Sequence, residues 1–320
     1  AAQGPANARR LMERLSPNLS PAEREVLGTR ALALEACSRS LLRLFSADAC
    51  RMMDEINPRV VVGFDALPRL RTSYLVAARR RGLPTVFCQH GLFSALDYPS
   101  PWFDEFLVVN EYTRELLSGQ IPPTARITVV GDPSLDALVT QPPQALRAVP
   151  EHSGPVALIA TQPNGPPGSE RRPGWWFAAL AQACAKLQLC AEVKLHPQQR
   201  PEVEGRMYER SLADAGASGL ILPHGEADLN ALLAGCDVFV SQFSSSILAA
   251  VALGKSTMFV DLRNGPPFYP FDDFDMALRA TTPQAIEETL RAALERSLPG
   301  TDPVLHSRFY ARHLAPLDGR

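Results

Sequence analysis

The first part of the chain alternates two kinds of hydrophobic pattern. Continuous runs of apolar and β-branched residues, typical of strands buried on both faces, occupy 58–66, 84–89, 105–110 and 125–133. Segments with an apolar residue at every third or fourth position, typical of amphipathic helices, occupy 9–57, 70–81 and 111–119. Strand–helix alternation of this kind predicts parallel βαβ units.

A Pro-rich, polar stretch at 140–155 has no periodicity, so we predict a linker at 141–155. The alternation then restarts, with strands predicted at 156–161, 191–197, 219–223, 237–242 and 256–262, and helices at 174–189, 201–215, 227–236, 244–254, 282–297 and 302–316. The pattern predicts an α/β protein of two Rossmann-like domains, whose parallel sheets face an interdomain cleft. The expected parts are a domain at 1–140, the linker, a domain at 156–300 and a helical tail at 301–320.

Composition narrows the class of protein. With 320 residues, 46% of them apolar and 21% charged, the chain is long enough for two globular domains. The net charge of −2 gives no basic field for nucleic acid. The six cysteines show neither CxxC pairs nor metal-ligand spacing, which is typical of reduced thiols in a cytosolic protein. We find no membrane-spanning run and no signal peptide, and expect a cytoplasmic protein.

Polar residues cluster where the predicted strands of the second half end. Ligands of open parallel sheets bind outside the carboxyl ends of the strands, so these residues are candidates for a binding site. They are, in order of the strands that they follow, Gln162 and Asn164, then Lys194, His196 and Pro197, then His224 and Glu226, and finally Ser244, Ser245 and Ser246.

Each candidate also has a structural interpretation. The serine triplet opens a predicted helix, where hydroxyls and free N–H groups suit a phosphate, although one serine alone could be the N-cap. His196 could face a ligand, directed by Pro197, or bond a backbone carbonyl. The loop with Gln162 and Asn164 suits a phosphate or ribose, or is a plain turn. Asp228 is most simply a helix N-cap, while His224 could contact a base or ribose.

The HP pair at 196–197 and the serines at 244–246 resemble motifs of GT-B nucleotide-sugar glycosyltransferases, especially bacterial sialyl-, polysialyl- and Kdo transferases that use CMP-sugars. "GLPTVFCQHG" and "ITVVGDPSLDAL" are similar to strand ends of the acceptor domain in that class. The resemblance spans about 57–300 and implies a GT-B-like fold, truncated at its amino terminus. It also implies that the HP pair contacts CMP and that the serines hold its phosphate.

The resemblance further implies transfer from a nucleotide-sugar to an oligosaccharide or lipid-linked acceptor in capsule or lipopolysaccharide synthesis. Peripheral association with the inner membrane would suit a lipid-linked acceptor. Ala249 and Ala250 stand where UDP-sugar enzymes and the related 2-epimerases carry a ribose-binding Glu, which argues against both. CDP-glycerol phosphotransferases share the HP and QHG motifs, so they remain an alternative. A nucleotide-sugar 2-epimerase-like isomerase is a further alternative, disfavoured by the missing Glu, and a non-catalytic module with an incomplete amino-terminal half is another.

The predicted general base is His90, because Gln89-His90-Gly91 stands where many sialyltransferases have a catalytic Asp-Gly. His90 could instead fix its loop or bind the donor phosphate. Asp65 is the second candidate for the base, or a partner of His90, and Asp97 a weaker one. One histidine base favours inversion. No DxD-like pair follows a nucleotide-binding strand, so we expect catalysis without a metal ion or a cofactor. The acidic run at 272–275 is expected to be a surface or acceptor-facing loop.

Overall fold

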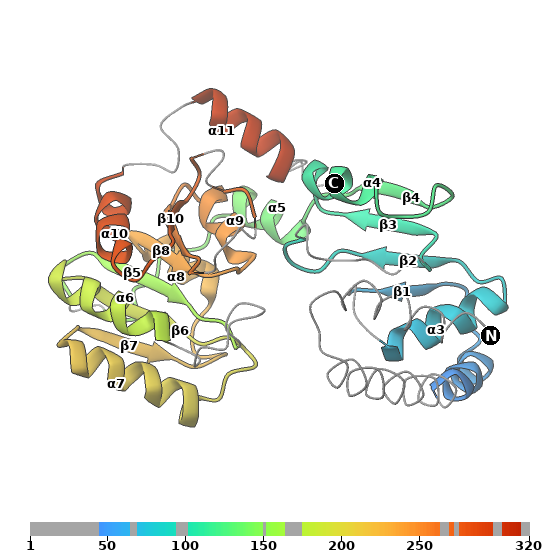
Figure 1. Ribbon diagram of the computed structural model, residues 1–320, viewed down its shortest axis with the longest axis horizontal. Coiled ribbons are helices and arrows are strands. Elements are labelled where there is room, and N and C mark those ends of the chain that lie inside the picture. The colour runs from blue at the N-terminus through green and yellow to red at the C-terminus, as the bar shows by residue number, and fades with distance from the viewer. Residues whose placement is uncertain are drawn as a thin grey trace, which may run out of the picture. The chain divides into compact units, whose positions relative to one another are not determined.

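The computed structural model describes residues 45–64, 69–93, 102–149, 152–163, 175–262, 269–271, 275–296 and 303–314. The chain forms an α/β protein with two parallel sheets (Figure 1). Its contacts divide it into two compact units, the first made of 1–88, 98–106 and 120–126 and the second of 89–97, 107–119 and 127–320.

The smaller sheet has four strands that follow one another in chain order: β1 (Val61–Gly63), β2 (Thr85–Cys88), β3 (Glu105–Val108) and β4 (Arg126–Val129). Val61 lies opposite Thr85, and the hydrogen bonds from Asp104 N to Thr85 O and from Arg126 N to Asp104 O continue the same parallel direction. Helix α3 (Arg69–Arg80) packs on β1 and β2. Alternate residues of β2 and β3 are fully buried, as expected of strands with one well-covered face.

Helices α4 (Glu111–Ser118) and α5 (Pro133–Thr140) follow β3 and β4. Helix α4 is the predicted one, and it begins after Asn110, whose side chain accepts from Thr113 N. The sequence pattern predicts a strand at 125–133 and no helix after it, whereas β4 ends at Val129 and α5 begins at Pro133. Its start signal is nevertheless local, with Asp132 accepting from Ser134 N and a proline in the first helical position.

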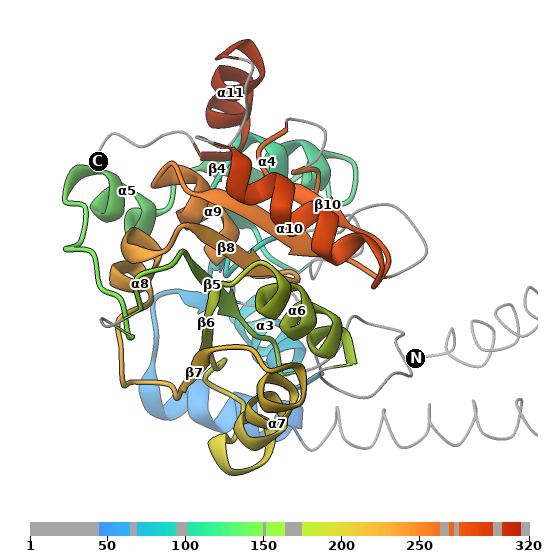
Figure 2. The ribbon, with the colours of Figure 1, turned by 90° about the vertical axis from the view of Figure 1, so that its left-hand side faces the viewer.

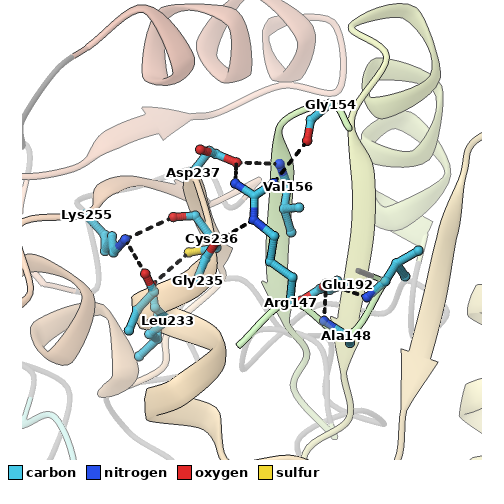
Figure 3. A network of polar contacts seen from close by, with 12 residues as sticks. Arg147, Ala148, Gly154, Val156, Glu192, Leu233, Gly235, Cys236, Asp237 and Lys255 are labelled. Atoms are coloured by element: carbon cyan, nitrogen blue, oxygen red, sulfur yellow. Dashed lines mark hydrogen bonds and ion pairs between the residues drawn. The ribbon is translucent and has the colours of Figure 1, made fainter. Parts of the chain in front are cut away.

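The Pro-rich segment after α5 belongs to the second unit and is hydrogen-bonded to the rest of it. Arg147 donates to the carbonyls of Gly235 and Gly154 and forms an ion pair with Asp237, at 3.0 Å, as Figure 3 shows. Leu146 N donates to Ala231 O at 2.9 Å. Hydrogen bonds and an ion pair therefore hold this segment against the end of α8 and the start of β5.

The larger sheet has six parallel strands in the order β10 (Leu278–Ala280), β9 (Ser256–Val260), β8 (Val238–Ser241), β5 (Val156–Ala160), β6 (Cys190–Lys194) and β7 (Gly219–Leu222). Every residue of β5, β6, β8 and β9 is buried, which explains their continuous apolar sequences. Strand β10 is short and was not predicted.

Helices cover both faces of this sheet (Figure 2). One face, which includes Ile159 and Val240, packs against α6 (Trp175–Lys186), α7 (Arg206–Ala215) and α10 (Ala285–Glu295). The other, which includes Leu158 and Phe239, packs against α5, α8 (Leu229–Gly235) and α9 (Ser246–Ala252). The predicted helix at 201–215 begins as a π-helical turn, η1 (Pro201–Gly205), before α7.

The last described helices are α11 (Pro303–Phe309) and the π-helical turn η3 (Tyr310–Leu314), which packs on α4. His313 is buried there: its Nδ1 lies 2.8 Å from the Tyr269 hydroxyl, and its carbonyl accepts from Asn110 Nδ2. Burial and the nearby Arg312 lower the pKa of His313 to about 3. The described helices include none long and apolar enough to cross a membrane.

Candidate functional site

A pocket of about 500 Å³ lies at the carboxyl ends of β5, β6, β7 and β8. The chain runs from β5 outward through β6 to β7, and then returns to the other side of β5 with β8, so the strand order reverses between β5 and β8. Doubly wound sheets bind ligands at such a reversal. The pocket is lined by Ala160, Thr161, Gln162, Lys194, Leu195, His196, Pro197, His224, Gly225, Ala227, Asp228, Leu229, Ser244 and Ser246.

Lys194 ends strand β6 and brings a buried positive charge to the pocket. Lys194 is only 7% exposed, and its Nζ donates to Pro223 O at 2.7 Å. Burial lowers the pKa of Lys194, while Glu226 and Asp228 act in the opposite direction. An ammonium group has three N–H donors, so the bond to Pro223 leaves capacity for an anion in the pocket.

His196 follows β6 in a turn that sets the orientation of its ring. Nδ1 accepts from Gln198 N at 3.2 Å, so the neutral ring carries its proton on Nε2. Partial burial and the nearby His224 lower the pKa of His196, which favours this neutral form. His196 thus contributes a neutral N–H donor, Nε2, at the wall of the pocket.

The three serines differ from one another. Ser244 and Ser246 line the pocket, and their hydroxyls are hydrogen-bonded to each other. Ser246 N donates to Ser244 Oγ at 3.2 Å, and helix α9 begins at Ser246, two residues later than predicted. Ser245 is exposed, does not line the pocket, and makes no capping bond from its N-cap position. Ser244 and Ser246 therefore present paired hydroxyls to the pocket.

The loop after β7 supplies His224, which is exposed and lines the pocket, and Glu226, which does not line it. Asp228 is the N-cap of α8, as predicted, since its side chain accepts from Ala231 N at 2.8 Å. The same residue also lines the pocket. Its carboxylate is thus held by a backbone donor near Lys194.

Of the residues predicted for catalysis, His90 is described, and it is not among the residues that line the pocket. His90 is exposed after β2, in a loop fixed by Gln89, whose Oε1 accepts from Val109 N and whose Nε2 donates to Gly91 O. Asp65, Asp97 and Asn164 lie outside the described residues, as does 272–274.

Asp275, the last residue of the predicted acidic loop, is paired with Arg296 at 2.7 Å. Within the described ranges, no group of three or more His, Cys, Asp or Glu side chains could hold a metal ion.

Gln199 is an additional residue of the site. Its side-chain amide makes hydrogen bonds that join the loop after β5 to the loop after β6. The partners are Thr161, Gln162, His196 and Tyr208. Hydrophobic periodicity gives no signal for such a residue. The sequence "HPQQ" does give a signal for a β-turn, because Pro favours the second position of such a turn. The turn is present, since Gln199 N donates to His196 O at 2.9 Å.

Comparison with known proteins finds likeness in structure only. No protein-family model matches the chain, and no curated protein matches it by sequence. Solved structures that resemble it include the S. aureus MnaA–UDP co-structure, with a TM-score of 0.60 and 14% identity over 85% of this chain and 80% of that one. Another is the Neisseria meningitidis UDP-GlcNAc 2-epimerase bound to UDP-GlcNAc, with a TM-score of 0.56 and 15% identity over 96% and 83%.

The Methanocaldococcus jannaschii UDP-GlcNAc 2-epimerase, in complex with UDP-GlcNAc and UDP, gives a TM-score of 0.56 with 12% identity over 84% of this chain and 79% of that one. The chain has a GT-B-like fold. The fold class predicted from the sequence, α/β with two parallel sheets, is confirmed.

Proposed function

We propose that the protein is a nucleotide-sugar glycosyltransferase that binds the nucleotide part of its donor in the pocket at the carboxyl edge of the six-stranded sheet. The observation that carries this proposal is the set of anion-binding groups collected there. Lys194 supplies a buried ammonium, His196 a neutral N–H, and Ser244 and Ser246 paired hydroxyls. The solved structures with the same fold include complexes with UDP and UDP-GlcNAc, which supports a nucleotide as the ligand.

The charge of the pocket favours a donor with one phosphate. Of the described residues that line it, Lys194 is the only lysine or arginine and Asp228 the only carboxylate. A sugar linked to a nucleoside monophosphate carries one negative charge on its phosphodiester, whereas a nucleoside diphosphate-sugar carries two. One ammonium with neutral N–H and O–H donors suits the single charge, so we propose a CMP-sugar, with UDP-sugars as the alternative.

Glycosyl transfer requires that the departing nucleotide phosphate be stabilised as its bond to the sugar breaks. Lys194 and the pocket hydroxyls would do this directly, since donors already held in place stabilise developing charge. We assign no metal ion to this step, because Lys194 supplies the positive charge. The acceptor hydroxyl must lose its proton, and His90 and Asp65 remain the proposed bases. A glycan or lipid-linked acceptor stays part of the proposal.

A nucleotide-sugar 2-epimerase is the second candidate, because solved structures of the same fold carry that activity in their names. Ala249 and Ala250 argue against it. Both are buried in α9, where the resemblance places a ribose-binding carboxylate. A CDP-glycerol-type transferase would use the same pocket, with the hydroxyl attacking at phosphorus.

Isothermal titration calorimetry with CMP, CDP and UDP tests the proposal. We expect CMP to bind most tightly, and Lys194→Met to weaken its binding by at least about tenfold, because a charge-assisted hydrogen bond is lost. Ser244→Ala should weaken binding less. Ser245→Ala should leave it unchanged, because that side chain lies outside the pocket.

The matched control is Lys186→Met, which removes an exposed lysine paired with Glu287 on α10 and should leave binding unchanged. Tighter binding of UDP than of CMP would refute the donor assignment. No nucleotide binding at all would refute the proposed function. Conversion of UDP-GlcNAc to its 2-epimer would identify the isomerase instead.

A further inference from the structure

We propose that Gln199 is the positioning residue of the pocket, and that its single side-chain amide sets the loop after β5 against the loop after β6. The inference deepens the proposed function, because it concerns the same pocket and takes a nucleotide as the ligand. Gln199 is only 5% exposed and is not itself part of the pocket wall.

The four hydrogen bonds of this amide fix its orientation. Oε1 accepts from His196 N at 2.9 Å and from the Thr161 hydroxyl, while Nε2 donates to Gln162 O at 2.9 Å and to the Tyr208 hydroxyl at 3.2 Å. A backbone N–H can only donate and a carbonyl can only accept, so His196 and Gln162 together permit one orientation of the amide. The two hydroxyls can rotate to suit it.

The amide has no capacity left for a ligand. A glutamine side chain offers two N–H donors and two acceptor lone pairs, and all four are matched by these partners. Gln199 therefore acts on the pocket through the residues that it holds.

Of the residues that Gln199 holds, Thr161, Gln162 and His196 line the pocket proposed for the nucleotide. The turn at His196–Gln199 is closed twice, by Gln199 N to His196 O and by His196 N to Gln199 Oε1, and the same turn orients the His196 ring through Gln198 N. Thr161 N donates to Lys194 O at 3.1 Å, which ties the end of β5 to the end of β6. A shift of Gln199 would therefore move the loop after β5 and the loop after β6, which both line the pocket beside Lys194.

Replacement by glutamate gives a test that depends on protonation. At pH 8 the side chain of Gln199→Glu is a carboxylate, which cannot donate to Gln162 O and lies against that carbonyl oxygen. When protonated, the carboxyl group has the shape of the amide and regains an O–H donor. Burial raises the pKa of a carboxyl group, so protonation at pH 5.5 is within reach.

The experiment compares the dissociation constants of CMP and UDP at pH 8 and pH 5.5 for the wild type, Gln199→Glu and Gln198→Ala. The last variant is a matched control, because Gln198 is exposed and contributes only its backbone N to the turn. We expect Gln199→Glu to bind about tenfold more weakly than the wild type at pH 8, and the ratio to approach one at pH 5.5. The control should match the wild type at both values.

A ratio near one at pH 8, or a ratio that does not change with pH, would overturn the proposal, because general loosening of the fold does not follow protonation of residue 199. If the wild type binds neither nucleotide, the proposed function fails, and the ring of His196 then decides the positioning role. Nitrogen-15 NMR at pH 8 should find the Nε2–H tautomer in the wild type and a mixture in Gln199→Glu. An unchanged tautomer would overturn the positioning role.

Discussion

The two sheets are both parallel, yet they bury their strands differently. In the six-stranded sheet every residue of β5, β6, β8 and β9 is buried, whereas in the four-stranded sheet the residues of β1 and β4 are half-buried or exposed. The reversal of the strand order at β5 explains the complete burial of the four central strands, because helices then cover both faces of that sheet.

The reversal also creates the site. Loops from β5 and β8 diverge to opposite faces of the six-stranded sheet and leave room at its carboxyl edge, where the pocket lies. The four-stranded sheet, as described, runs in one direction and has no such reversal. Its own cavity, of about 400 Å³, is lined by apolar residues of β1 and α3 together with Phe103. The six-stranded sheet thus carries a pocket with polar and charged residues in its lining, and the four-stranded sheet carries a mainly apolar one.

A pair of matched phenylalanine substitutions tests the burial contrast most strongly. Phe239→Ala removes a fully buried ring from β8 and should lower the free energy of unfolding by about 3–5 kcal/mol. Phe64→Ala, next to β1, removes a ring that is 61% exposed and should change it by about 0.5 kcal/mol or less. Urea denaturation followed by circular dichroism measures both. Similar losses in the two variants would contradict the contrast.

His313, in the second unit, makes folding stability depend on pH. Its pKa of about 3 in the folded protein lies below the ordinary value of 6.5, so folding stability is complete above about pH 6.5 and falls as the pH decreases toward 3. The slope should approach about 1.4 kcal/mol per pH unit from this one group. Comparing urea denaturation of the wild type and His313→Gln between pH 7 and pH 4 isolates it. An identical slope in the variant would show that His313 does not titrate on unfolding.

Two glycines contrast a tight position with an open one, and give the smallest expected effect. A Cβ at Gly235 would lie 2.0 Å from Leu146 O, so Gly235→Ala must displace the segment that Leu146 and Arg147 anchor. We expect a loss of about 1–3 kcal/mol. Gly119→Ala meets nothing within 4 Å and should change stability by about 0.5 kcal/mol or less. Equal thermal unfolding of the two variants would indicate that the segment yields without cost.

The sequence allowed much of this fold to be predicted, because short continuous apolar runs such as β5 and β8 are typical of strands buried on both faces. Strand β10 is three residues long, too short for periodicity to be recognised. The sequence pattern does not predict α5, because its capping residue, Asp132, stands within the run 125–133, whose pattern is typical of a strand.

For the site, residues after strands could be named in advance, since parallel strands share one edge. Gln162, Lys194, His196, Pro197, His224, Ser244 and Ser246 do line one pocket. Their individual roles stay predictions. Gln199 could not be found in this way, because its importance comes from partners brought together only by folding, among them Thr161 and Tyr208.

The segment anchored by Arg147 has a practical consequence for dividing the chain. A second half cut to begin at Val156 would lose α5, whose Leu135 and Leu138 are buried in the same core as Leu232 and Ala250. It would also lose Leu146, whose N donates to Ala231 O, and Arg147, which forms the ion pair with Asp237. A shortened chain that begins ahead of Asp132 keeps those contacts, and is the one to express when this half is studied alone.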